Sequence, residues 1–152
     1  MKKIMLDTNI FGRPYDDIGQ ERIRKEAAIA RQIFQLSVQK KIVLVSSDVL
    51  FAEISLIKDE AKKEMILTLV KELCFTHIVL SEEITLIADK IYLFLNDYMD
   101  ALHVAFCAMA ECDYFITCDD EITKNALLIE KYLTTNGYNV KIRSPEIFAE
   151  EL

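Results

Sequence analysis

The chain has 152 residues, of which 52% are apolar, and it carries a formal net charge of −7. This length is typical of one globular domain that buries a core without disulfide bonds. The negative charge argues against a protein that coats nucleic acid through a basic surface, although it does not exclude a nuclease whose acids bind cations. Glycine and proline nowhere cluster into a linker, so we expect one domain over residues 1–152.

The N-terminus and the cysteines bear on where the protein works. The apolar run after Met1–Lys3 meets Asp7 after three residues, which is too short for a signal peptide, and no apolar stretch is long enough to span a membrane. We therefore expect a cytoplasmic protein with reduced cysteines. A zinc site is the weaker alternative, because the spacing of its ligands fits no usual pattern: His103, Cys107, Cys112 and Cys118.

Hydrophobic periodicity predicts strands that alternate with helices. In chain order it predicts a strand at Lys3–Leu6, a helix at 20–39, a strand at Ile42–Val45, and helices at 48–57 and 59–73. An extended connector or edge strand follows at 76–80, and helices follow at 82–95 and 97–111. The last predicted elements are a strand at Tyr114–Thr117, a short helix after Asp119 and a strand around Val140 and Ile142. This alternation indicates βαβ units, and hence an α/β fold whose mostly parallel sheet has helices on both faces.

Four acids are placed where they can meet at one edge of this sheet. Asp7 follows the first strand and Asp119 follows the third, so their side chains emerge at the same carboxyl edge if these strands are neighbours. Glu53 and Asp100 lie in apolar stretches of predicted helices. An acid on an apolar face is costly to bury unless it is paired or binds a cation. We therefore treat these four as a candidate metal-binding set.

Each of these acids also has an ordinary structural alternative. Asp7 and Asp119 suit the N-caps of helices, Glu53 suits a solvated helix face, and Asp100 suits the first turn of a helix, where the dipole favours a negative charge. The neighbouring acids Asp120 and Glu121 can share the role of Asp119, which we prefer because it is nearest to the end of the strand. Only the joint placement of the four acids favours a site.

At this point the sequence resembles the PIN-domain ribonucleases over nearly its whole length. The resemblance rests on four short motifs in the order and approximate spacing of that family, and on the ending 137–148: Leu6–Asn9, Val49–Ile54, Asp100–Ala105 and Tyr114–Asp119. It implies a three-layer α/β/α sandwich that hydrolyses RNA with Mg²⁺ or Mn²⁺. By this resemblance Asp7, Glu53 and Asp100 match the three most regular acids of the family, Asp119 matches the fourth, and Thr8 and Asn9 match supporting polar groups.

Clustered carboxylates suit this chemistry because they are hard oxygen donors, which Mg²⁺ and Mn²⁺ prefer. In a site with two ions about 4 Å apart, one ion lowers the pKa of the attacking water and the other stabilises the leaving 3′-oxygen. The expected products are RNA fragments with 5′-phosphate and 3′-hydroxyl ends. Either one bound ion or two would give these products.

The histidines and the basic residues allow several interpretations. His103, three residues after Asp100, is either a general base or a packed neighbour of the ligands, and we favour the second; His77 has no evident partner. Arg13 and Lys124 follow the acidic motifs closely and are candidate phosphate contacts. A basic stripe on the first long helix is equally well explained as a solvated face: Arg22, Arg24, Lys25 and Arg31.

The resemblance further implies a VapC-like toxin that forms a homodimer and is restrained by an antitoxin protein. The stretch Phe11–Asp17 departs from the usual toxin pattern and indicates a distinct subgroup. A rival from another class is a catalytically silent PIN-like module that only binds a partner, since a fold does not settle a function. A phosphatase of the haloacid-dehalogenase type ranks low, because it normally requires Asp-x-Asp and the second position here is Asn9.

Overall fold

The computed structural model describes residues 1–152. The strands are β1 (Lys2–Leu6), β2 (Ile42–Ser47), β3 (Cys74–Ile78), β4 (Tyr114–Ile116) and β5 (Lys141–Arg143). The helices are α1 (Thr8–Gly12), α2 (Glu21–Val38), α3 (Asp48–Ser55), α4 (Glu60–Leu73), α5 (Glu82–Ile91), α6 (Tyr98–Met109), α7 (Asp120–Lys124), α8 (Ala126–Thr135) and α9 (Pro145–Glu151), with short 3-10 helices at Arg13–Tyr15 and Tyr92–Phe94. None of these helices has the length and hydropathy needed to cross a membrane.

All five strands run parallel in one sheet, in the order β3-β2-β1-β4-β5. The central strand β1 pairs on both sides, so that Met5 lies opposite Val45 of β2 and Phe115 of β4. The predicted neighbourhood of the first and third strands is therefore confirmed. Parallel pairing brings the carboxyl ends of β1, β2 and β4 to the same edge of the sheet.

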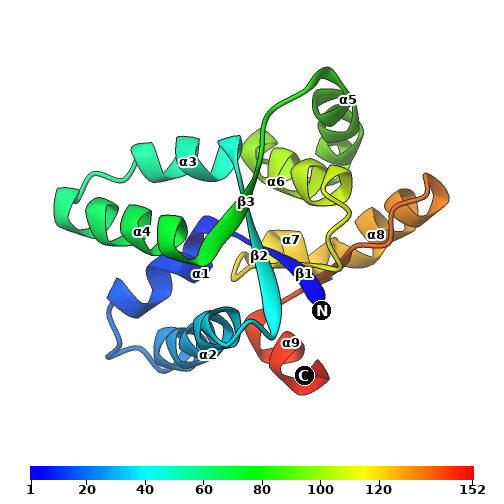
Figure 1. Ribbon diagram of the computed structural model, residues 1–152. Coiled ribbons are helices and arrows are strands. Elements are labelled where there is room, and N and C mark those ends of the chain that lie inside the picture. The colour runs from blue at the N-terminus through cyan, green and yellow to red at the C-terminus, as the bar shows by residue number, and fades with distance from the viewer.

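Two hydrophobic cores cover the two faces of the sheet. Ile4 and Leu6 point into one core with α1, α2, α3, α4 and α9, whereas Met5 points into the other with α5, α6 and α8. This alternation follows from the period of two residues in a strand. Figure 1 shows the helices of the two cores on opposite sides of the strands. The predicted α/β fold with helices on both faces is thus confirmed.

The differences from the predicted elements lie in short or polar segments. Helix α1 was not expected next to Gly12 and Pro14, but the side chain of Asp7 caps it by accepting the N–H of Thr8. The helix predicted at 82–95 ends at Ile91 and continues as a 3-10 turn, and α8 follows α7 as a separate helix after Asn125. Of the two alternatives for 76–80, the edge strand is correct, and it begins earlier, at Cys74.

The buried Phe115 of β4 provides a test of the core. Phe115 is fully buried and its ring packs on His103, with ring centroids 5.8 Å apart. We expect Phe115→Ala to lower the free energy of unfolding by about 3–5 kcal/mol, because it removes buried area and leaves a cavity. The matched control is Phe75→Ala, since Phe75 is 90% exposed and its loss should change stability by less than about 0.5 kcal/mol. Equal midpoints of the two variants in urea would contradict this assignment of the core.

Candidate metal centre

The four predicted acids line one pocket at the carboxyl edge of the sheet. Asp7 directly follows β1, Glu53 lies in α3, Asp100 lies in α6, and Asp119 directly precedes α7. The pocket has a volume of about 500 Å³, and ten of its lining residues are polar or glycine: Asp7, Thr8, Asn9, Gly12, Asp16, Glu53, Lys62, Asp97, Asp100 and Asp119. The structure therefore brings together acids that are up to 112 residues apart in sequence, from Asp7 to Asp119.

Asp7 is buried at the end of β1 and is held by hydrogen-bond donors. Its Oδ1 accepts the N–H of Thr8 at 2.7 Å, and its Oδ2 accepts the hydroxyl of Thr117 at 2.7 Å and the side-chain amide of Asn9 at 3.3 Å. Burial raises the pKa of Asp7, and nearby His103 and the Thr117 hydrogen bond offset only part of this effect. The carboxyl group is thus fixed in position but is costly to ionise without further positive charge.

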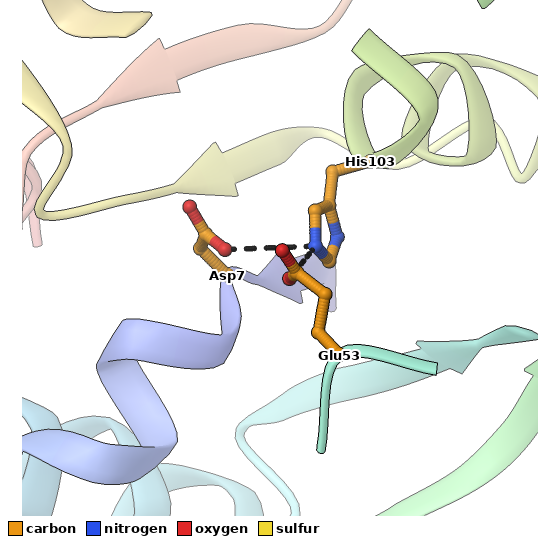
Figure 2. Close-up of side chains that lie close together, drawn as sticks. All are labelled: Asp7, Glu53 and His103. Carbon is orange, nitrogen blue, oxygen red and sulfur yellow. Dashed lines mark hydrogen bonds and ion pairs between the residues drawn. The ribbon is translucent and has the colours of Figure 1, made fainter. Parts of the chain in front are cut away.

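Glu53 and Asp7 face the same imidazole edge. Figure 2 shows His103 of α6 with Nε2 directed toward both carboxyl groups; it hydrogen-bonds Glu53 and lies 3.6 Å from Asp7 Oδ1. Glu53 Oε1 also accepts the hydroxyl of Thr8 at 2.6 Å. Burial by itself raises the pKa of Glu53, but the hydrogen bond and charge of His103 outweigh it and leave the pKa below its ordinary value.

His103 is packed inside the protein, as we expected for a neighbour of the ligands. It is fully buried, and its Nδ1 has no hydrogen-bond partner. Burial lowers the pKa of His103, yet the nearby Asp7 and the bond with Glu53 outweigh burial and raise the pKa overall. The two carboxylates therefore favour the protonated form of the imidazole.

Asp100 is buried among three other acids of the site. Burial, followed by the charges of Asp7, Asp97 and Asp119, raises its pKa from 3.8 to about 7, and His103 opposes this only in part. The Asp97 side chain caps α6 by accepting the N–H of Met99, which places Asp100 in the first turn of the helix. A carboxyl group in such surroundings favours either a proton or a bound cation.

Asp119 lines the pocket and its two acidic neighbours do not. Its N–H donates to the Thr117 hydroxyl at 3.0 Å, and its side chain caps α7 by accepting the N–H of Glu121. Asp120 is exposed and paired with Arg22, and the Glu121 carboxylate accepts the N–H of Asn96. The capping alternatives for Asp7 and Asp119 are thus also realised, together with their places in the pocket.

The donor set fits a hard divalent cation. One ligand atom each of Asp7, Glu53 and His103 lie within 4.8 Å of one another, and Asp100 and Asp119 add carboxylates along the same pocket. Oxygen-rich sets suit Mg²⁺ and Mn²⁺. The alternative zinc set is not assembled, because His103 instead joins Asp7 and Glu53, and the buried Cys107 thiol donates toward the carbonyl of Tyr114.

The predicted phosphate contacts lie outside this pocket. Arg13 is occupied by Asp16 and Glu26, each at 2.9 Å, and Lys124 is exposed at the end of α7. The cation that lines the pocket is instead Lys62 of α4, paired with Asp16 at 2.5 Å. Lys62 lies in the helix that follows Glu53 and the α3 motif, and only the packing of α4 brings it to the pocket, so no local signal pointed to it.

Thr117 is the functional residue that sequence reasoning missed. Its hydroxyl donates to Asp7 and accepts from the Asp119 amide, so that one side chain positions two of the acids. A buried threonine at the carboxyl end of an apolar strand, two residues before an acid, was the available signal. Asn9 has a similar positioning role, since its side-chain oxygen accepts the N–H of Cys118 at 3.1 Å. Because Asn9 is an amide and not an acid, it does not provide the second aspartate of the Asp-x-Asp motif that a haloacid-dehalogenase phosphatase requires.

The sequence matches no protein-family model and no curated protein. Five chains of solved structures match the fold. One belongs to the crystal structure of VapBC2 from Rickettsia felis bound to a DNA fragment from their promoter. The match covers 93% of this chain and 98% of that one, with a TM-score of 0.57 and 14% identity. The likeness supports the predicted PIN-like fold. At this identity it shows the fold alone.

The raised pKa of Asp100 predicts a pH dependence of stability in the metal-free protein. Between pH 4 and 7 the folded state binds this proton more tightly than the unfolded state, so the free energy of unfolding falls as the pH rises, by at most about 1.4 kcal/mol per pH unit. Asp100→Asn removes this term. In EDTA, urea denaturation at pH 4.5 and 8 should therefore show a gain in stability over the wild type at pH 8 and little change at pH 4.5.

The control for this measurement is Glu64→Gln, which removes an exposed acid of α4 outside the pocket. Its stability should follow that of the wild type in parallel at both pH values. If Asp100→Asn also runs parallel to the wild type, Asp100 does not carry the raised pKa.

Proposed function

We propose that the protein is a divalent-metal-dependent ribonuclease. The observation that carries this proposal is the convergence of Asp7, Glu53, Asp100 and Asp119 on one pocket at the carboxyl edge of a parallel sheet. Ligands of open α/β sheets bind at this edge. The PIN-like fold supports the same activity by analogy, and the resemblance of the four motifs to PIN-domain ribonucleases adds to it.

The acids would hold Mg²⁺ or Mn²⁺, with Asp7 and Glu53 as the best-positioned ligands. When bound, such a cation supplies an activated nucleophile and neutralises charge on the scissile phosphate. Thr8, Asn9 and Thr117 keep the Asp7 carboxyl group oriented through their hydrogen bonds. His103 holds Glu53 from the buried side of the pocket, so that the open side is left to the substrate.

Basic groups beside the pocket would contact the RNA backbone. Lys62 lines the pocket, and the exposed Lys124 is available on α7. Arg13 would have to leave Asp16 and Glu26 to reach a phosphate, so its role is better described as holding the acidic loop. A few local cations suffice, because most of the affinity of proteins for nucleic acid comes from phosphate contacts.

We further propose that the protein acts in the cytoplasm as the toxin of a toxin–antitoxin pair. The Rickettsia felis neighbour was solved as VapBC2 on promoter DNA, which supports an antitoxin protein as partner. A homodimer is supported by apolar side chains exposed on and after α5: Leu86, Tyr92 and Leu93. Burial of such a surface is a usual driving force for symmetric association.

Cation binding should stabilise the fold. Mn²⁺ or Mg²⁺ at a hundredfold excess over its dissociation constant adds about 2.7 kcal/mol to the free energy of unfolding, because only the folded chain assembles the site. Thermal unfolding with EDTA and with each cation measures the effect, and Asp7→Asn should abolish it. A melting temperature that neither cation changes would argue against a metal centre and in favour of a catalytically silent interaction module.

Adjacent acids provide a matched pair for the activity. Asp119→Asn should reduce cleavage of a mixed single-stranded RNA in Mn²⁺ by more than the roughly 10–100-fold typical of outer-shell changes, while asparagine still caps α7. Asp120→Asn should keep full cleavage, because Asp120 lies outside the pocket and pairs with Arg22. Gel analysis of end-labelled RNA, with EDTA and Asp100→Asn as inactive references, gives the rates.

Equal rates for the two variants would remove Asp119 from the mechanism. Cation binding with no cleavage of any RNA by the wild-type protein would count against the nuclease.

A further inference from the structure

A second group of hydrogen-bonded polar side chains lies at the outer edge of the sheet, and it shares no residue with the carboxylate pocket. Ser46 Oγ lies 2.8 Å from His77 Nδ1, and His77 Nε2 lies 2.7 Å from Asp48 Oδ1. The three residues come from consecutive elements: the end of β2, the first residue of α3, and β3. They line a pocket of about 410 Å³ with Phe51, Lys71 and Cys74. None of these residues belongs to the metal centre.

The hydrogen bonds fix one arrangement of protons in the neutral imidazole. Asp48 accepts the N–H of Leu80 at 2.7 Å and a bond from His77, and these donors keep its pKa below the ordinary value. The ionised carboxylate therefore requires the imidazole proton on Nε2. Nδ1 is then left as the nearer acceptor for the hydroxyl proton of Ser46, at 2.8 Å, since the other acceptor, the carbonyl of Thr76, lies at 3.4 Å. This is the relation of nucleophile, base and orienting acid that activates a serine hydroxyl.

A bulge in the edge strand places His77 opposite Ser46. Leu44 pairs with Cys74, but the next residue, Val45, pairs with Thr76, so one extra residue of β3 is inserted at Phe75. Without this insertion Thr76 would lie opposite Ser46. Bulges at sheet edges commonly redirect a side chain beside a functional site.

The surroundings of Ser46 suit an acyl group. Ser46 lies at the carboxyl end of a parallel strand and directly before Ser47, the N-cap of α3. The first N–H groups of an α-helix have no partner within the helix, so the start of α3, apart from the Leu50 N–H that Ser47 Oγ accepts, and the nearby Lys71 offer donors for an oxyanion. Ser46 is only 3% exposed, so the hydroxyl is reached through the pocket and by small groups.

We propose that Ser46, His77 and Asp48 form a second, metal-independent active site that hydrolyses esters of small carboxylic acids. Ser46 Oγ bonds to the carbonyl carbon while its proton passes to His77 Nδ1. The bond from carbon to the alcohol oxygen then breaks, and the alcohol takes that proton. Water, deprotonated by the same nitrogen, attacks the acyl-serine; the acid leaves and Ser46 regains its proton. Asp48 orients the imidazole throughout.

The test uses p-nitrophenyl acetate in EDTA, so that the metal centre cannot contribute. The wild-type chain should release nitrophenolate well above the buffer rate, and Ser46→Ala and His77→Gln should each lower the rate on the order of a hundredfold, as loss of a nucleophile or general base does. Ser55→Ala, which changes an exposed serine at the end of α3, should leave the rate unchanged.

A fluorophosphonate probe gives a readout that does not depend on turnover. Intact-mass and peptide analysis should place one adduct on Ser46, absent in His77→Gln. No adduct, or an adduct on another residue, would overturn the proposal. A lowered melting temperature of Ser46→Ala without any adduct would show that the three residues only fasten β3 to β2 and α3.

Discussion

Parallel pairing of β1 with β2 and β4 is the constraint on which the rest of the molecule depends. Because the three strands run in the same direction, the residues that follow each strand emerge at one edge: Asp7 after β1, Asp48 after β2 and Thr117 to Asp119 after β4. Helices α3 and α6 then bring Glu53 and Asp100 over the same edge. Two hydrophobic cores fix this arrangement from both faces, so the acids cannot move apart without loss of packing.

Crowding of carboxylates is costly, and the structure offsets the cost unevenly. Asp7 has three hydrogen-bond donors, and Glu53 has Thr8 and His103. Asp100 is left among like charges, and its pKa rises to about 7. Like charges held close together are expected at functional sites, where groups positioned to bind a ligand lower the stability of the fold. A divalent cation resolves the conflict at Asp100 in a way that His103, already paired with Glu53, does not.

The predictability of the structure follows the range of the interactions involved. The strands and long helices were predictable because each carries its own periodicity, and Asp7 and Asp119 because both follow apolar strands. The hydrogen bond of His103 with Glu53 was not, since it depends on how α6 packs against Phe115. Nor was the role of Thr117, which needs the register of β1 against β4. Helix α1 is short and depends on one cap from Asp7, a signal that nearby Gly12 and Pro14 obscured.

The range of the interactions also explains why the site at the edge strand could not be predicted from the sequence. Ser46 and His77 are 31 residues apart, and only the bulge at Phe75 makes them partners. A shift of one residue in register turns a side chain to the other face of a sheet, so the position of His77 is set by β2 and not by its own neighbours. The two sites therefore differ in origin. The carboxylate pocket follows from strand order, whereas the Ser46 site follows from one inserted residue in the edge strand.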